Sequence, residues 1–144
     1  MCYVGASEEA SFVEALLRGR GAIFEADDLD PLAFSAIEST QPLRLAQLHG
    51  AGLHKIGATS VIASGPYSAS RPWSLALHNH PDQPDGIAYR ARHDDDVLCA
   101  AVYDRARTKL ATRSTEPVLE NLDRLRRLCE RYDAAVMRGG VRLA

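Results

Sequence analysis

The chain has 144 residues, enough for one domain with a proper hydrophobic core. Hydrophobic residues make up 46% and charged residues 25%, as in ordinary globular proteins, and no apolar run reaches the length of a membrane span. The net charge of −2 lacks the Lys/Arg excess that a nucleic-acid-binding surface requires. We therefore expect neither nucleic acid nor a membrane as a partner.

The cysteines indicate the compartment. Cys2, Cys99 and Cys129 are odd in number and far apart, unlike the cysteines of a disulfide framework. They predict free thiols in a reducing cytoplasm, and Cys99 is expected in a core strand because its neighbours are apolar.

The first elements are predicted between residues 3 and 21. A short strand begins at Tyr3, and Ser7 is a good N-cap for the helix that follows. Gly19 and Gly21 are expected to end this helix. Its apolar stripe consists of Ala10, Phe12, Val13, Leu16 and Leu17.

Glu14 lies on the rim of that stripe. At helical spacing its carboxylate sits beside Ala10 and Leu17, so it is placed to face a cleft. It is also four residues before Arg18, in the order that favours a helical ion pair. The pattern alone favours the ion pair.

The middle of the chain predicts two strands. Residues 33–37 alternate in polarity, residues 43–47 follow, and Gln41–Pro42 breaks the chain between them. The short break predicts that these strands pair with each other in antiparallel fashion. Residues 50–57 are expected to form a loop with one helical turn around Leu53.

A second long helix is predicted to begin at Ser68 or Ser70. Pro72 would lie in its first turn, where proline is tolerated. The turn-rich stretch that starts at Pro81 ends it. Its apolar stripe consists of Trp73, Ala76 and Leu77.

Two strands are predicted next, at residues 87–91 and 97–103, joined by a hairpin loop at residues 93–96. The second is apolar on both faces and is expected to be central. A further strand at 109–113, a helix from Glu116–Pro117 and a final strand at 134–136 complete the chain. Without a regular βαβ repeat, this order favours an α+β fold with a mixed or antiparallel sheet.

Two common kinds of site are not expected. His78 and His80 lie two apart at the end of a helical pattern, so their side chains should point apart, and no metal site is predicted. The phosphate-binding loop of NTPases and the glycine-rich dinucleotide motif are both absent, so the chain should not bind NAD as a dehydrogenase does.

Three polar side chains have both structural and functional interpretations. Ser68 suits a turn or N-cap, but a hydroxyl there also donates to an anion at the helix N-terminus. Arg71 would add positive charge to the same anion. Tyr3 either buries its ring in the core or stacks it on a flat ligand ring at the mouth of a cleft.

Five segments together resemble the RES-domain family, in the same order as in that family. They are residues 3–7 (YVGAS), 12–18 (FVEALLR), 67–76 (YSASRPWSLA), 85–92 (DGIAYRAR) and 98–105 (LCAAVYDR). The resemblance covers residues 2–105, and we treat the whole chain, 1–144, as a single RES-like domain.

This resemblance implies a fold like that of ADP-ribosyltransferases and a bacterial toxin that consumes NAD. Glu14 and Ser68 would be its catalytic residues, and Tyr3, Ser68 and Arg71 would line the NAD site. NAD would be the substrate rather than a resident cofactor, with inorganic phosphate or water as acceptor. An Xre-like antitoxin would be the protein partner.

The family's named arginine lies upstream of the tyrosine-bearing strand, and none of residues 1–144 occupies that place. The resemblance therefore implies weak or absent turnover for these residues alone, and recovery when an upstream Arg-containing segment is joined to them.

Other functions remain open. The same fold would also serve a protein ADP-ribosyltransferase, because acceptor pockets are made of loops. A third hypothesis is an inactive module that keeps only its partner-binding surface. The apolar C-terminal helix completes the core or forms a dimer seam, so a homodimer is a further expectation.

Overall fold

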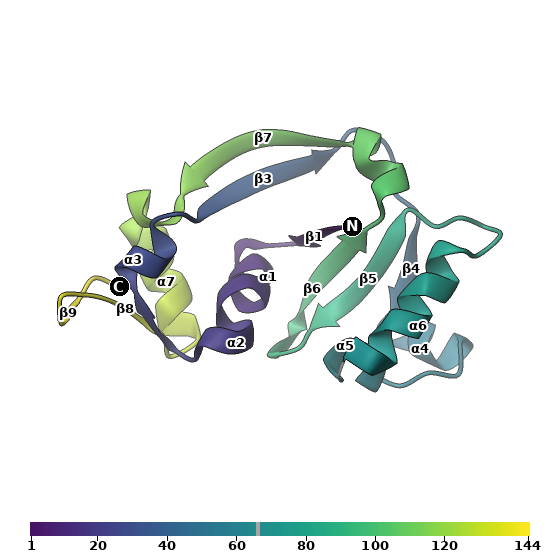
Figure 1. Ribbon diagram of the computed structural model, residues 1–144, viewed down its shortest axis with the longest axis horizontal. Helices are drawn as coiled ribbons and strands as arrows, with labels where there is room; N and C mark the ends of the chain where they lie inside the picture. Colours follow the sequence, from purple (N-terminus) through teal and green to yellow (C-terminus); the bar gives the residue numbers. More distant parts are fainter. Residues whose placement is uncertain (66) are drawn as a thin grey trace.

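A four-stranded mixed sheet forms the centre of the computed structural model, which describes residues 1–65 and 67–144 (Figure 1). The strand order is β1 (Cys2–Gly5), β6 (Asp94–Val102), β5 (Gly86–Ala91), β4 (Leu45–Leu48). The β1–β6 and β5–β6 pairs are antiparallel, and β4 pairs with β5 in parallel. The α+β class and the mixed sheet are thus confirmed.

Strand β6 is central, as predicted. It pairs on both sides, and Cys99, Ala101 and Val102 are buried. The hairpin loop is shorter than predicted, because β6 already begins at Asp94. The Asp94 carboxylate accepts a 2.7 Å hydrogen bond from the Tyr132 hydroxyl, which holds this acidic residue in the strand.

The N-terminal strand–helix unit is also confirmed. The helix runs through α1 (Glu8–Phe12), a π-helical turn η1 (Val13–Leu17) and α2 (Arg18–Arg20). The Ser7 hydroxyl caps it by accepting a 3.2 Å hydrogen bond from the backbone N–H of Ala10. It ends at Gly21, whose φ of +74° suits glycine.

The predicted pairing of the middle strands is wrong. Strand β3 (Ala33–Ser39) pairs with β7 (Leu110–Pro117) in an antiparallel ribbon, whereas β4 joins the central sheet. The ribbon arches away from that sheet (Figure 1). Contacts between residues distant in sequence determine this arrangement.

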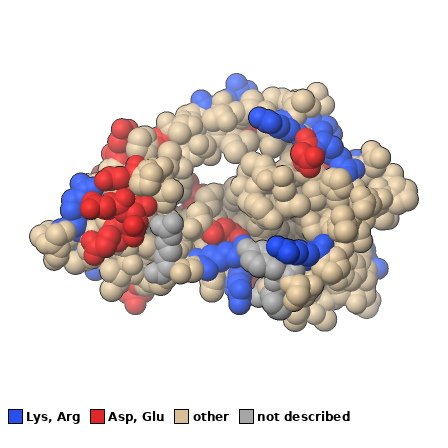
Figure 2. Space-filling model, viewed as in Figure 1, with Lys and Arg blue, Asp and Glu red and all other residues tan. Residues whose placement is uncertain are grey.

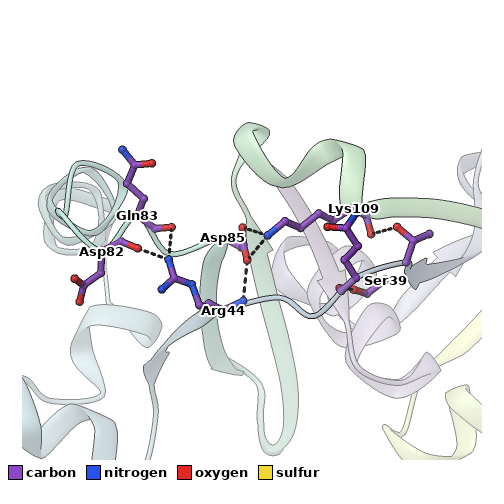
Figure 3. A network of polar contacts seen from close by, with 8 residues as sticks. Ser39, Arg44, Asp82, Gln83, Asp85 and Lys109 are labelled. Atoms are coloured by element: carbon purple, nitrogen blue, oxygen red, sulfur yellow. Dashed lines mark hydrogen bonds and ion pairs between the residues drawn. The ribbon is translucent and has the colours of Figure 1, made fainter.

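Asp85 makes two contacts between residues distant in sequence, one with Arg44 and one with Lys109 (Figure 3). Its carboxylate is buried, accepts a 2.8 Å hydrogen bond from the backbone N–H of Arg44, and pairs with Lys109 Nζ at 2.8 and 2.9 Å. Lys109 precedes β7 and Arg44 precedes β4. One carboxylate therefore fixes the ends of the ribbon and of the sheet beside each other.

Three helices cover the β4–β5 end of the sheet (Figure 1). They are α4 (Ala51–Lys55), which confirms the predicted turn around Leu53, α5 (Val61–Ser64) and α6 (Tyr67–His78). Trp73 and Leu77 of α6 pack against the buried cluster of Leu48, Ile62, Ile87 and Tyr103.

Two details of α6 differ from the prediction. Pro72 lies inside the helix rather than in its first turn, because the helix begins at Tyr67. Ala76, predicted in the apolar stripe, is exposed. Trp73 and Leu77 provide apolar contacts with the sheet.

The C-terminal part forms a second, three-stranded sheet with the segment that follows the first helix. Strand β2 (Ile23–Glu25) pairs in parallel with β8 (Ala135–Arg138), which confirms a strand near residues 134–136. The remaining elements are α3 (Ala26–Leu29), η2 (Asp104–Lys109), η3 (Val118–Glu120), α7 (Leu122–Arg131) and β9 (Val141–Arg142).

The predicted start of the C-terminal helix is too early. Glu116 and Pro117 belong to β7, and α7 begins only after Asn121, whose side chain caps it by accepting a 3.0 Å hydrogen bond from the backbone N–H of Arg124. Leu125 of α7 then packs with Phe12 and Phe24 in the larger core cluster. In the part of the chain that the structure describes, no helix is long and apolar enough to cross a membrane.

Candidate functional site

A cavity of about 550 Å³ lies between β1, the end of the first helix, the central sheet and α6. Tyr3 and Arg71, two of the predicted site residues, line it. Other aromatic and charged side chains join them from elements far apart in sequence: Arg18, Trp73, Tyr89 and Tyr103.

The Glu14 carboxylate contacts two of the side chains that line this cavity. Arg18 Nη1 lies 3.2 Å from Glu14 Oε2, so the predicted ion pair is confirmed. The Tyr89 hydroxyl donates to the same oxygen at 3.4 Å, and the Arg92 backbone N–H donates to Oε1 at 3.2 Å. Glu14 itself does not line the cavity, but its carboxylate contacts Arg18 and Tyr89, which both do.

The backbone of Tyr89 is held by both neighbouring strands of the sheet. In β5 it lies opposite Leu48 of β4 on one side and Cys99 of β6 on the other. Burial, and next the negative charge of Glu14, raise the pKa of the Tyr89 hydroxyl. The hydroxyl therefore stays protonated and remains a donor at neutral pH.

Tyr3 does not bury its ring in the core. Its residue is 63% exposed in the edge strand β1, and it lines the cavity. The core interpretation of Tyr3 is thus wrong, and stacking on a ligand ring remains a prediction.

The part of the cavity lining formed by α6 and Tyr103 is aromatic and partly polar. The rings of His78 and Tyr103 meet edge to face at 4.9 Å, and the Tyr103 hydroxyl donates a 2.9 Å hydrogen bond to the carbonyl of Ser74. All three residues line the cavity together with Trp73. Flat side chains at this wall suit a flat ligand.

Ser68 is not brought to this site. It is an exposed residue within α6 rather than an N-cap, and it does not line the cavity. Ser70 and Ser74, one helical turn apart, line the cavity instead. Of the two predicted site residues in α6, Arg71 lines the cavity and Ser68 does not.

Sequence reasoning missed Tyr89, Trp73 and Tyr103 as site residues and treated Arg18 only as an ion-pair partner. Tyr89 and Trp73 stood within the segments that carry the family resemblance, but periodicity assigned them to a strand and a helical stripe. No signal in the pattern indicated that strand β5 lies beside the first helix.

Metal ligands do not gather at this site. Among residues 1–65 and 67–144, no group of three or more His, Cys, Asp or Glu side chains is placed to hold a metal ion. His78 borders the cavity, whereas His80 pairs with Asp82 at 3.7 Å.

A second cavity, of about 510 Å³ and mostly apolar, lies between the β3–β7 ribbon and the central sheet. The space-filling view shows an opening beneath the arch (Figure 2). Val4, Ala100 and Val102 contribute to its sheet side, and Ile37 and Leu110 to its ribbon side. Tyr3 borders both cavities.

Comparison with known proteins gives one informative similarity. No model of a protein family matches the chain, and no solved structure matches it. The chain is 28% identical over 111 residues to a protein of Sinorhizobium fredii named Probable toxin y4kH. The matched residues cover 76% of this chain and 87% of that protein, so the similarity extends over most of both.

Proposed function

We propose that this chain is a bacterial toxin that cleaves the nicotinamide–ribose bond of NAD and transfers the ADP-ribosyl group to phosphate or water. The similarity to a protein named as a probable toxin supports the toxin role. The RES-like segments support NAD as the substrate and an ADP-ribosyltransferase-like fold. The observation that carries the proposal is the contact of the Glu14 carboxylate with two side chains of one large cavity.

The cavity suits a dinucleotide in size and lining. About 550 Å³ falls within the range of small-molecule sites. Tyr3 and Trp73 offer flat faces for the nicotinamide or adenine ring. Arg18 and Arg71 supply guanidinium groups for the diphosphate.

The proposed chemistry needs a carboxylate beside the ribose. Breaking the C1′–N bond sends its electron pair to the nicotinamide ring, which leaves neutral, so no general acid is required. Positive charge develops on the ribose, and the Glu14 carboxylate would stabilise it. A phosphate or water oxygen then bonds to C1′, and the proton of an attacking water passes to Glu14.

Arg18 links binding to this chemistry. It contacts Glu14 and also lines the cavity, so a diphosphate that enters competes with the carboxylate for the same guanidinium. Transfer of Arg18 to the diphosphate would leave Glu14 Oε2 to face the ribose. An Xre-like antitoxin in the cytoplasm would neutralise the toxin by covering this cavity.

The test is NAD consumption by the purified chain, with and without phosphate, followed by product masses. We expect slow loss of NAD, free nicotinamide and an ADP-ribosyl product, with faster loss once an upstream Arg-containing segment is joined to residues 1–144. Dependence on phosphate would indicate phosphorolysis, and ADP-ribose attached to a protein in a cell lysate would favour the protein-modifying alternative.

Glu14→Gln should lower kcat at least a hundredfold while the protein stays folded, because the charge that stabilises the ribose is lost. Glu130→Gln on the exposed side of α7 is the matched control and should keep wild-type activity. Wild-type kcat in Glu14→Gln, or no NAD binding by calorimetry in the wild-type chain, would refute the proposal.

A further inference from the structure

Three donors hold the Glu14 carboxylate, and they differ in how firmly each is fixed. Arg18 reaches it from the same helix by a long side chain. Arg92 donates through its backbone N–H in the β5–β6 turn. Tyr89 is the side chain that reaches it from the central sheet.

Both the backbone and the ring of Tyr89 are fixed by their neighbours. Its backbone pairs with both neighbouring strands, β4 and β6. Its side chain packs against the buried cluster beneath the first helix, which contains Val13 and Cys99, and against the cluster beneath α6, which contains Ile87 and Tyr103. A ring fixed in this way presents its hydroxyl in one place without loss of side-chain entropy on substrate binding.

The hydroxyl can only donate to Glu14, since a carboxylate is an acceptor. The raised pKa of Tyr89 keeps that proton in place at neutral pH. In addition, Tyr89 lines the cavity. The donors Tyr89 and the Arg92 backbone do not belong to Arg18, so movement of Arg18 need not break them.

We infer that Tyr89 is a positioning residue for the proposed reaction: it orients the Glu14 carboxylate toward the ribose once Arg18 has turned to the diphosphate. The inference rests on the proposed function and extends it to a residue that the family resemblance did not single out. Because it acts through Glu14, Tyr89 should affect turnover more than substrate binding.

Tyr89→Phe is the direct test, because it removes only the hydroxyl and keeps the packed ring. We expect kcat for NAD loss to fall about tenfold, the effect of one charge-assisted hydrogen bond, with KM changed less than about twofold. Tyr132→Phe is the matched control: it removes a tyrosine–carboxylate hydrogen bond, to Asp94 at 2.7 Å, outside the cavity. It should leave both constants unchanged.

Wild-type kcat in Tyr89→Phe, or a change confined to KM, would overturn the inference while leaving the proposed function standing. Equal loss of kcat in Tyr132→Phe would also overturn it, because the effect would then be one of general stability. If the wild-type chain consumes no NAD, either alone or joined to an upstream Arg-containing segment, the proposed function itself fails, and the role assigned to Tyr89 fails with it.

A thermal-unfolding cycle tests the contact separately from activity. The shifts in Tm of Tyr89→Phe and Glu14→Ala should be non-additive in the double variant, because both remove the same hydrogen bond. Additive shifts would show that the hydroxyl and the carboxylate do not interact in solution, which would overturn the inference.

Discussion

Two carboxylates are each held by several donors, but they are held differently. The Asp85 side chain is 7% exposed and its contacts are 2.8 to 2.9 Å long. The Glu14 side chain is 16% exposed and its contacts are 3.2 to 3.4 Å long. Short, buried contacts suit a structural junction, whereas the longer contact of the flexible Arg18 side chain at a cavity wall is easier to exchange for a ligand.

Lys109→Met should therefore destabilise the fold by roughly 2 kcal/mol at pH 7, because Asp85 stays buried without its cation. The hydrogen bond from Lys109, followed by that from the Arg44 backbone, lowers the pKa of Asp85. A lowered folded-state pKa contributes stability that is present above the unfolded value, about 4, and lost as pH falls through the folded value.

Urea unfolding at pH 7 and pH 3 measures this effect. The difference between the wild type and Lys109→Met should shrink at pH 3, because without Lys109 the buried Asp85 carboxylate gains a proton and no longer bears an uncompensated charge. A difference that stays constant with pH would show that the loss arises from packing of the lysine side chain alone. Lys55→Met on the exposed surface of α4 is the control and should change little.

At the scale of elements, the first helix determines where the site lies. Its Ser7 cap sets the starting residue, and its π-helical turn contains Glu14 and is followed by Arg18. A π turn inserts an extra residue into the helical repeat, and such turns are frequent at functional sites. Here the turn sets the face on which Glu14 and Arg18 meet Tyr89 of strand β5.

Ser7→Ala should lower the free energy of unfolding by about 1 kcal/mol, because the backbone N–H of Ala10 loses its acceptor. Ser11→Ala, within the same helix, is the control and should have a smaller effect, since alanine favours the helix interior. Denaturant unfolding measures both. Equal losses would show that the cap does not set the stability of this helix.

At the scale of the whole molecule, the β3–β7 ribbon stands away from the central sheet and leaves the second cavity beneath it (Figure 1). The ribbon is joined to the sheet through the Asp85 junction at one end. At the other end it leads into the core formed by Phe12, Leu125 and their neighbours. The sheet face below the ribbon is thus incompletely packed.

Ala100→Val tests this packing. The residue lines the second cavity on β6, so added methyl groups have room, and valine favours a strand. We expect stabilisation of up to about 1 kcal/mol in thermal unfolding. Ala91→Val, in the packed cluster beneath the first helix, should instead destabilise by about 1 to 3 kcal/mol. Equal destabilisation by both would show that the space beneath the ribbon is filled in solution.

The sequence by itself determined the local elements. The Ser7 cap, the stripe from Ala10 to Leu17 and the apolar run of β6 predicted a strand, a helix and a central strand, and all three are confirmed. Two residues that it offered as site candidates, Tyr3 and Arg71, line one cavity, and their role there stays a prediction. These features depend on neighbours within a few residues of one another.

Only the tertiary structure decided which strands pair and which side chains converge. The contact between Glu14 and Tyr89 spans 75 positions, and that between Arg44 and Asp85 spans 41. No local pattern encodes such contacts, so the predicted pairing of β3 with β4 was wrong. Packing of the sheet against the first helix and α6 buries apolar side chains of both, which removes apolar surface from water and stabilises this pairing.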